Sequence, residues 1–246
     1  SRDEVFRASG PTFSTSMKIR MGVTSDGKIT ACEGRFSYQH GAFAGSSAGF
    51  GATCAMAGYD CVNIDFDCYD VVLNRPKAAA YRAPGAPMSC YAIESVLDEI
   101  AQKLDMDPID LRLKNAVKEG MNSVYGPTFG PIGFVECLEA ARDHPNMKAP
   151  LGPNQARGIA GGFWPNFGGL TSVSVNVTDD GNVLVSLGTP DIGGSRAGMC
   201  MMAAEELGIA YDRVQAIIAD TSSLGFNDTT GGSRVTHSAG MATIEA

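Results

Sequence analysis

One arginine of this sequence stands in a loop rich in glycine and proline, Ala79-Ala80-Tyr81-Arg82-Ala83-Pro84-Gly85-Ala86-Pro87, directly before a predicted helix. A guanidinium group offers a fixed fork of hydrogen-bond donors, and a helix N-terminus adds partial positive charge, so this position suits an anion or a polarised oxygen. The same arginine could instead be structural and pair with a nearby carbonyl group or acid. Residue types alone leave both interpretations of Arg82 open.

Two more turns, in the second half of the chain, combine glycine with hydroxyl side chains and an arginine. They are Gly188-Thr189-Pro190-Asp191-Ile192-Gly193-Gly194-Ser195-Arg196 and Asp228-Thr229-Thr230-Gly231-Gly232-Ser233-Arg234-Val235-Thr236. Small residues before a helix let backbone N–H groups approach a phosphate closely, and the helix end favours negative charge. Each turn by itself also fits an ordinary helix cap. Together they indicate a ligand that carries phosphate.

Other side chains with chemical potential do not group along the sequence. The three histidines His40, His144 and His237 are far apart, and none of the seven cysteines forms a C-x-x-C pair, so no metal site is predicted within the chain. We expect the cysteines to be scattered, buried, free thiols. Trp164, with Phe163 and Phe167, is expected to be part of a core or an interface.

Composition limits the classes of partner. The chain has 246 residues and a formal net charge of −8, which disfavours a general nucleic-acid or membrane-surface role because phosphate groups would be repelled. No apolar run approaches the ~20 residues that cross a bilayer, and the N-terminus lacks the shape of a signal peptide. We therefore expect a cytoplasmic protein with no nucleic-acid or membrane partner.

Two segments share an alternating pattern around an Asp-Gly dipeptide. Apolar residues alternate in 17–31 around Ser25-Asp26-Gly27-Lys28, and again in 173–187 around Thr178-Asp179-Asp180-Gly181-Asn182. A period of two indicates strands, and Asp-Gly supplies the positive φ that tight hairpins require. The chain is therefore predicted to contain two similarly built lobes.

Helices are predicted after each hairpin. Pro87 stands at a suitable first helical position, followed by one apolar stripe of Ile93, Val96, Leu97, Ile100, Ala101 and Leu104. Asp107 is expected to cap a second helix, and a third amphipathic run lies near 134–142. In the second lobe one helix should stop at Gly208, and a last helix should begin near Ser233. Hairpins interleaved with helices predict an α+β fold rather than a doubly wound parallel sheet.

A linker is predicted between the lobes at 144–156, because this stretch has three prolines and few apolar residues. The first lobe then covers 1–143 and the second covers 157–246.

The loop around Arg82 and the helices after it resemble one protein family. The resemblance is carried by Tyr81 to Pro87, by Ile93-Glu94, and by the run from Asp98-Glu99-Ile100-Ala101 through Asp110-Leu111-Arg112-Leu113-Lys114-Asn115 to Lys118-Glu119-Gly120. These segments are similar to the substrate-side loop and following helices of molybdenum-cofactor-binding subunits of the xanthine dehydrogenase and aldehyde oxidase family. Residues 1–30, 157–193 and 231–234 resemble further segments of that family, in the expected order.

The resemblance implies a molybdenum hydroxylase. Such an enzyme adds water-derived oxygen to an electron-poor carbon of an aldehyde or an aromatic or N-heterocyclic substrate. Its cofactor is molybdenum-molybdopterin, including a cytosine dinucleotide form, and its electrons leave through iron–sulfur and FAD groups on partner domains or subunits. The resemblance also implies an oligomeric enzyme, in which 1–143 is the C-terminal part of one molybdopterin-binding lobe and 157–246 the N-terminal part of the next.

The resemblance also implies roles for individual residues. Arg82 would lie beside the substrate and orient it or stabilise negative charge. Pro84 would contact the substrate, at a position where purine-oxidising relatives carry an aromatic residue. Cofactor contacts are implied for Tyr81, Arg82, Gly193, Gly194, Ser195, Gly231, Gly232, Ser233 and Arg234.

The sequence departs from the family pattern in several places. Asp191-Ile192-Gly193-Gly194-Ser195 replaces a turn that contains glutamine in the family. The loop from Tyr81 to Pro87 has no cysteine, which argues against a copper-bridged carbon monoxide dehydrogenase site, and Pro84 argues against a purine substrate. The general-base glutamate is expected beyond Ala246, and two cofactor turns are expected before Ser1.

We therefore expect an internal fragment that is inactive by itself and self-associates through exposed apolar surface. Two alternatives remain open at the level of sequence. One is a scaffold or assembly module that kept the fold without the chemistry. The other is a different enzyme with a phosphate-bearing ligand.

Overall fold

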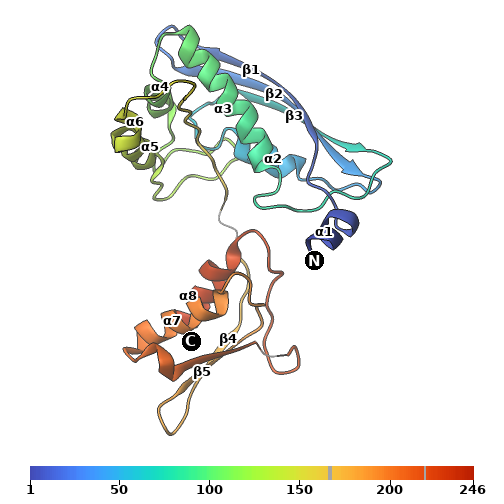
Figure 1. Ribbon diagram of the computed structural model, residues 1–246, viewed down its shortest axis with the longest axis vertical. Helices are drawn as coiled ribbons and strands as arrows, with labels where there is room; N and C mark the ends of the chain where they lie inside the picture. Colours follow the sequence, from blue (N-terminus) through green and yellow to red (C-terminus); the bar gives the residue numbers. More distant parts are fainter. Residues whose placement is uncertain (166–167, 219) are drawn as a thin grey trace. The chain divides into compact units, whose positions relative to one another are not determined.

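The computed structural model describes residues 1–165, 168–218 and 220–246 and is drawn in Figure 1. Its contacts divide the chain into two compact units, Ser1–Trp164 and Pro165–Ala246. Phe167, which the sequence placed in a core or interface, lies outside the described residues.

The first unit is built on a three-stranded sheet in the order β1-β2-β3. After the short helix α1 (Arg2–Ala8), β1 (Thr15–Val23) and β2 (Ile29–Gly41) form the predicted antiparallel hairpin. The chain then passes through α2 (Ala48–Ala55) to β3 (Ile64–Val72), which pairs with β2 in parallel. Neither α2 nor β3 was predicted from the sequence.

The second unit repeats this plan. Strands β4 (Val173–Val177) and β5 (Val183–Leu187) are antiparallel, and β6 (Val214–Ile218) pairs with β5 in parallel after α7 (Ser195–Leu207) and the short 3-10 helix η1 (Tyr211–Arg213). A π-helical turn, η2 (Val235–Ala239), leads into the last helix, α8 (Gly240–Glu245). The prediction of an α+β fold with two similarly built lobes is confirmed.

The two hairpin turns have the same hydrogen bonds. In the first turn, Thr24 N donates to Lys28 O at 2.9 Å and Gly27 N to Thr24 O at 2.9 Å. The second turn repeats both bonds, with the same lengths, between residues 178 and 182. Gly27 and Gly181 have φ of 85° and 75°, which an L side chain rarely adopts. The Asp-Gly dipeptides therefore fix the hairpins as the sequence predicted.

Helix α3 (Ala86–Lys103) lies along the sheet of the first unit (Figure 1). Of its predicted stripe, Ile93, Leu97, Ile100 and Ala101 are buried in the main core, and Val96 and Leu104 pack against that core. Asp107 caps α4 (Pro108–Asn115) as predicted, because its carboxylate accepts from Ile109 N at 2.7 Å. Helix α5 is Phe134–Asp143, and the predicted stop of α7 at Gly208 is confirmed by its left-handed backbone.

The division between the units differs from the predicted linker. Residues 144–156 contain helix α6 (Pro145–Lys148), and the first compact unit continues to Trp164. Residues 157–164, which the sequence assigned to the second lobe, pack on the first unit. The physical reason is a set of tertiary contacts, described below, that no local composition signals.

All seven cysteines are free thiols, as predicted. Cys68 and Cys137 are exposed rather than buried, because they lie on the outer faces of β3 and α5. No helix of the described residues is both long enough and apolar enough to span a membrane.

Candidate functional site

The loop that carries Arg82 is fixed at the start of α3. Gly85 has φ of 84°, and a Cβ atom there would lie 2.4 Å from the carbonyl oxygen of Ser47. The hydroxyl of Tyr38 donates to the carbonyl of Gly85 at 2.8 Å and also lies 2.5 Å from the hydroxyl of Ser89. Ala83 has φ of 54°, a backbone conformation that is uncommon without glycine. The loop is therefore held in one shape by its neighbours.

Tyr81, Arg82 and Pro84 line one cavity of about 380 Å³. Its other walls include Phe13, which precedes β1, and Tyr91 on α3, so the cavity is largely apolar. Arg82 is exposed, and none of the ion pairs among the described residues involves it. Arg82 therefore lines an apolar cavity, and among the described residues no carboxylate pairs with it.

In the second unit, the β5–α7 turn is open toward a ligand at its glycines. Gly193 and Gly194 have φ of 63° and 82°, and a Cβ atom at either position would meet nothing within 4 Å. The turn therefore leaves room for a polar group of a ligand to approach the backbone at both glycines.

A carboxylate already lies at the start of α7. Asp191 Oδ1 accepts from the backbone N–H of Arg196 at 3.1 Å, and its other oxygen lies 3.6 Å from Nε of the same arginine. Ser195 Oγ accepts from Ile192 N at 3.3 Å. Asp191 thus supplies negative charge at the place where a phosphate was predicted. Gly193, Gly194 and Ser195 are therefore better suited to neutral polar groups of a ligand.

The turn Gly231-Gly232-Ser233-Arg234 has a different arrangement. Gly232 and Ser233 both have φ of 66°, and Gly231 has open space around its Cα atom. The π-helical turn that follows is an uncommon element, often found at functional sites. The turn therefore presents a strained backbone that only surrounding contacts can hold.

Arg234 lies inside the unit rather than on its surface, with 3% of its area exposed. Its guanidinium donates to the carbonyls of Asp228 and Leu170 at 3.0 Å each and to the hydroxyl of Thr171. Its Nε has no partner among the described residues, and no carboxylate lies within ion-pair distance there. The Asp228 carboxylate lies close by, because its Oδ2 atom and Arg234 Nε would both lie within 3.0 Å of a Cβ atom on Gly169, although the two groups form no ion pair. The partnerless Nε atom therefore leaves one donor of Arg234 for a further acceptor.

Three polar atoms in the same unit are also buried without a partner among the described residues: Thr189 Oγ1, Asn227 Oδ1 and Ser238 Oγ. A Cβ atom on Gly188 would lie 2.6 Å from Nδ2 of Asn227, so the β5–α7 turn and the loop before Arg234 touch. Buried polar atoms of this kind normally have a hydrogen-bond partner. Residue types and spacing did not indicate these three residues, although each lies within or beside one of the glycine turns.

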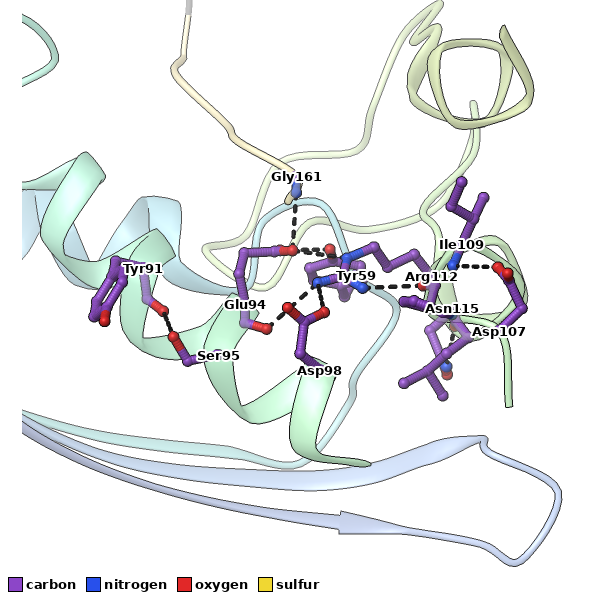
Figure 2. A network of polar contacts seen from close by, with 12 residues as sticks. Tyr59, Tyr91, Glu94, Ser95, Asp98, Asp107, Ile109, Arg112, Asn115 and Gly161 are labelled. Carbon is purple, nitrogen blue, oxygen red and sulfur yellow. Dashed lines mark hydrogen bonds and ion pairs between the residues drawn. The ribbon is translucent and has the colours of Figure 1, made fainter. Parts of the chain in front are cut away.

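A buried polar network of the first unit was also not predicted from the sequence (Figure 2). Glu94 of α3 and Arg112 of α4 form an ion pair of 2.8 Å, in which Arg112 has no exposed side-chain area. Both residues stood in the stretch that carried the family resemblance, but their partners lie far away in sequence. Among the described residues, no three His, Cys, Asp or Glu side chains come together as metal ligands.

Comparisons with known proteins point to one family. Two family models, each described as a molybdopterin cofactor-binding domain, match residues 1–116 and 138–246. The chain is 31% identical over 159 residues to the xanthine dehydrogenase molybdenum-binding subunit of Escherichia coli O157:H7, covering 58% of this chain and 21% of that protein. It is also 31% identical over 162 residues to the aldehyde oxidoreductase molybdenum-binding subunit PaoC of Escherichia coli K12, covering 61% and 22%.

The fold is shared with a solved structure as well. The aldehyde oxidoreductase from Desulfovibrio desulfuricans superposes with a TM-score of 0.82 at 27% identity, covering 96% of this chain and 28% of that one. The chain spans about a fifth of the length of its curated relatives. From the two matched domain models, the sequence identities and the shared fold, the chain belongs to the molybdopterin cofactor-binding domain family, found in the molybdenum-binding subunits of xanthine dehydrogenases and aldehyde oxidoreductases.

Proposed function

We propose that this chain is part of a molybdopterin-dependent oxidoreductase that oxidises an aldehyde or an aromatic or N-heterocyclic carbon with water-derived oxygen. The observation that carries the proposal is Arg234, a buried guanidinium whose Nε atom has no hydrogen-bond partner among the described residues, beside an open glycine turn. The partnerless atoms of Thr189, Asn227 and Ser238 add donors and acceptors for a polar ligand. These residues fit an anionic pterin with its phosphate and, in a dinucleotide form, its nucleotide tail.

In this proposal Gly193, Gly194, Ser195, Gly231, Gly232 and Ser233 contact the pterin or its tail through backbone and hydroxyl groups. Arg234 balances negative charge from beneath the turn. When bound, the cofactor supplies oxygen transfer and accepts two electrons, which pass on to iron–sulfur and FAD groups on partner domains or subunits.

On the first unit, Tyr81 and Arg82 border the cofactor and Pro84 faces the substrate. Apolar walls exclude water, and Arg82 donates hydrogen bonds to the oxygen or nitrogen of the substrate that gains negative charge. The general base is supplied by a glutamate outside these residues. The chain alone is then inactive, and the intact enzyme is an oligomer in the cytoplasm.

The test is the molybdenum and pterin content of the intact protein, by elemental analysis and by fluorescence of the oxidised pterin. Gly231→Val adds bulk where the protein leaves open space, and it should lower pterin content about tenfold, a change of ~1.4 kcal/mol in binding. Gly130→Val, also in open space but in the first unit, is the matched control and should retain pterin. Absence of molybdenum and pterin from the unaltered protein would refute the proposal.

A further inference from the structure

Residues 157–164, here called the connector, lie extended on the first unit with every second residue in contact. Ile159 packs against the small apolar cluster of Ile109, Ala116 and Leu138. The N–H of Gly161 donates to Glu94 Oε2 at 2.8 Å. The ring of Phe163 lies 5.8 Å from that of Tyr125, centroid to centroid. The connector is therefore packed along its length against the first unit.

The connector ends at Trp164, whose fluorescence can report on its surroundings. Trp164 is the only tryptophan of this chain, and its ring centroid lies 6.3 Å from that of Phe50. The second unit begins at the next residue, Pro165. Any change in docking at the end of the connector alters the surroundings of the Trp164 indole.

Glu94 is the polar centre of this docking (Figure 2). Its carboxylate accepts from Tyr59 OH at 2.5 Å, from Arg112 Nε at 2.8 Å and from Gly161 N. Burial and the neighbouring Glu94 raise the pKa of Tyr59, so this hydroxyl remains a donor. Arg112 is also held by Asp98 at 2.8 Å, which is half exposed. One buried carboxylate thus joins three segments that are far apart in the sequence.

Space at the contact is as restricted as the hydrogen bonding. A Cβ atom on Gly161 would lie 2.9 Å from the hydroxyl of Tyr59 and 3.0 Å from the ring of Phe134. Gly162, the next residue, has nothing within 4 Å of such an atom. Neither glycine has a positive φ, so alanine is compatible with the backbone at both positions. The pair therefore offers a substitution that tests docking with its own neighbour as control.

We propose that Glu94 is a latch that docks the connector on the first unit, with Arg112 holding the carboxylate in position. Opening the latch releases the eight residues 157–164, or about 26–29 Å of extended chain at roughly 3.3–3.6 Å per residue. The undocked segment between the two units then becomes longer by these residues. The latch does not depend on the proposed cofactor, because every contact that forms it lies within the first unit.

The test compares Gly161→Ala with Gly162→Ala in the full chain. Arg157 is exposed, but trypsin must also take up the residues that follow it, and docking holds Ile159 and Gly161 on the first unit. Cleavage after Arg157 is therefore expected to report the undocked population. Gly161→Ala should be cut there about tenfold faster than the unaltered protein, while Gly162→Ala should match it. Trp164 emission, isolated by subtracting the spectrum of a Trp164→Phe variant, should shift to the red only in Gly161→Ala.

A second pair of variants addresses the carboxylate. Glu94→Gln removes the charge and should behave like Gly161→Ala, whereas Asp98→Asn, which removes the other partner of Arg112, should leave cleavage within about twofold. The proposal is overturned if Gly161→Ala and Gly162→Ala are cut at the same rate. It is also overturned if Asp98→Asn opens the connector as much as Glu94→Gln does. If Glu94→Gln fails to fold, the cleavage rates of Gly161→Ala and Gly162→Ala still test the proposal.

Discussion

The Nε atom of Arg112 lies 2.8 Å from the Oε2 atom of Glu94, and both side chains are buried in the first unit. Glu94 lies on α3, the helix that begins directly after the Arg82 loop, and Arg112 lies on α4. The ion pair therefore fixes the helix that carries the loop against the next helix of the same unit. Removing one partner leaves the other charge buried without compensation.

Arg112→Met is expected to lower the free energy of unfolding of the first unit by about 3–5 kcal/mol, the usual cost of breaking a buried pair. Lys28→Met is the comparison, because Lys28 pairs with Asp60 in a setting that is about a third exposed, and it should cost ~0–1 kcal/mol. Urea unfolding followed by Trp164 fluorescence measures both. Equal midpoints for the two variants would contradict the prediction.

Substitution by alanine is expected to have little effect on stability at Arg82 and a large effect at Arg234. Arg82→Ala should change thermal stability by less than ~0.5 kcal/mol, because its side chain is exposed and no ion pair of the described residues involves it. Arg234→Ala should cost at least ~2 kcal/mol, since the carbonyls of Asp228 and Leu170 each lose a buried donor at roughly 1–3 kcal/mol.

Circular dichroism melts measure this difference in stability. In the intact enzyme Arg82→Ala should lower kcat about 10²-fold if it stabilises charge in the reaction. A stable Arg82→Ala enzyme with unchanged kcat would remove Arg82 from the chemistry.

Asp26 should titrate well below an ordinary aspartate. Hydrogen bonds from Lys114, and then from Thr24, lower its pKa from 3.8 to about 2. Because the folded pKa is depressed, this contribution to stability is complete above the unfolded pKa of ~3.9 and is lost as the pH falls through about 2. NMR titration of the carboxyl group measures the pKa, and Lys114→Met should raise it toward 3.8. A pKa unchanged in that variant would show that Lys114 is not the cause.

The thiols should differ in reactivity toward iodoacetamide. Burial raises the pKa of Cys32 and of Cys54 to about 12, so both should stay unmodified in the folded protein near pH 8. Cys68 and Cys137 are exposed and should be alkylated first. Peptide mass mapping over time gives the order, and a sample unfolded in urea, where all seven thiols should react, is the control.

Self-association of the isolated chain is expected to be visible by light scattering. Large apolar side chains are exposed in both units, among them Val62, Tyr91, Leu170 and Phe226, at 88%, 77%, 71% and 67%. The apparent mass should rise with protein concentration. A constant monomer mass would count against this expectation.

Local patterns in the sequence determined the hairpins and several helix ends. Asp-Gly requires a left-handed glycine, an aspartate before proline caps a helix, and Gly208 ends one, so each signal acts within a few residues of itself. The apolar stripe of α3 likewise predicted which face is buried. The turns around Arg82, Gly193 and Gly231 could be found in the same way, because glycine and hydroxyl residues before a helix are a local signature.

Only the tertiary structure decided the partners of these residues. It placed Arg234 inside the second unit, put the Asp191 carboxylate at the start of α7, and paired β3 and β6 in parallel with the hairpins. It also docked Gly161 on Glu94, 67 residues earlier in the chain. The physical reason is that the environment of a charge or a strand edge depends on which distant segment packs against it. Neither periodicity nor composition along the chain contains that information.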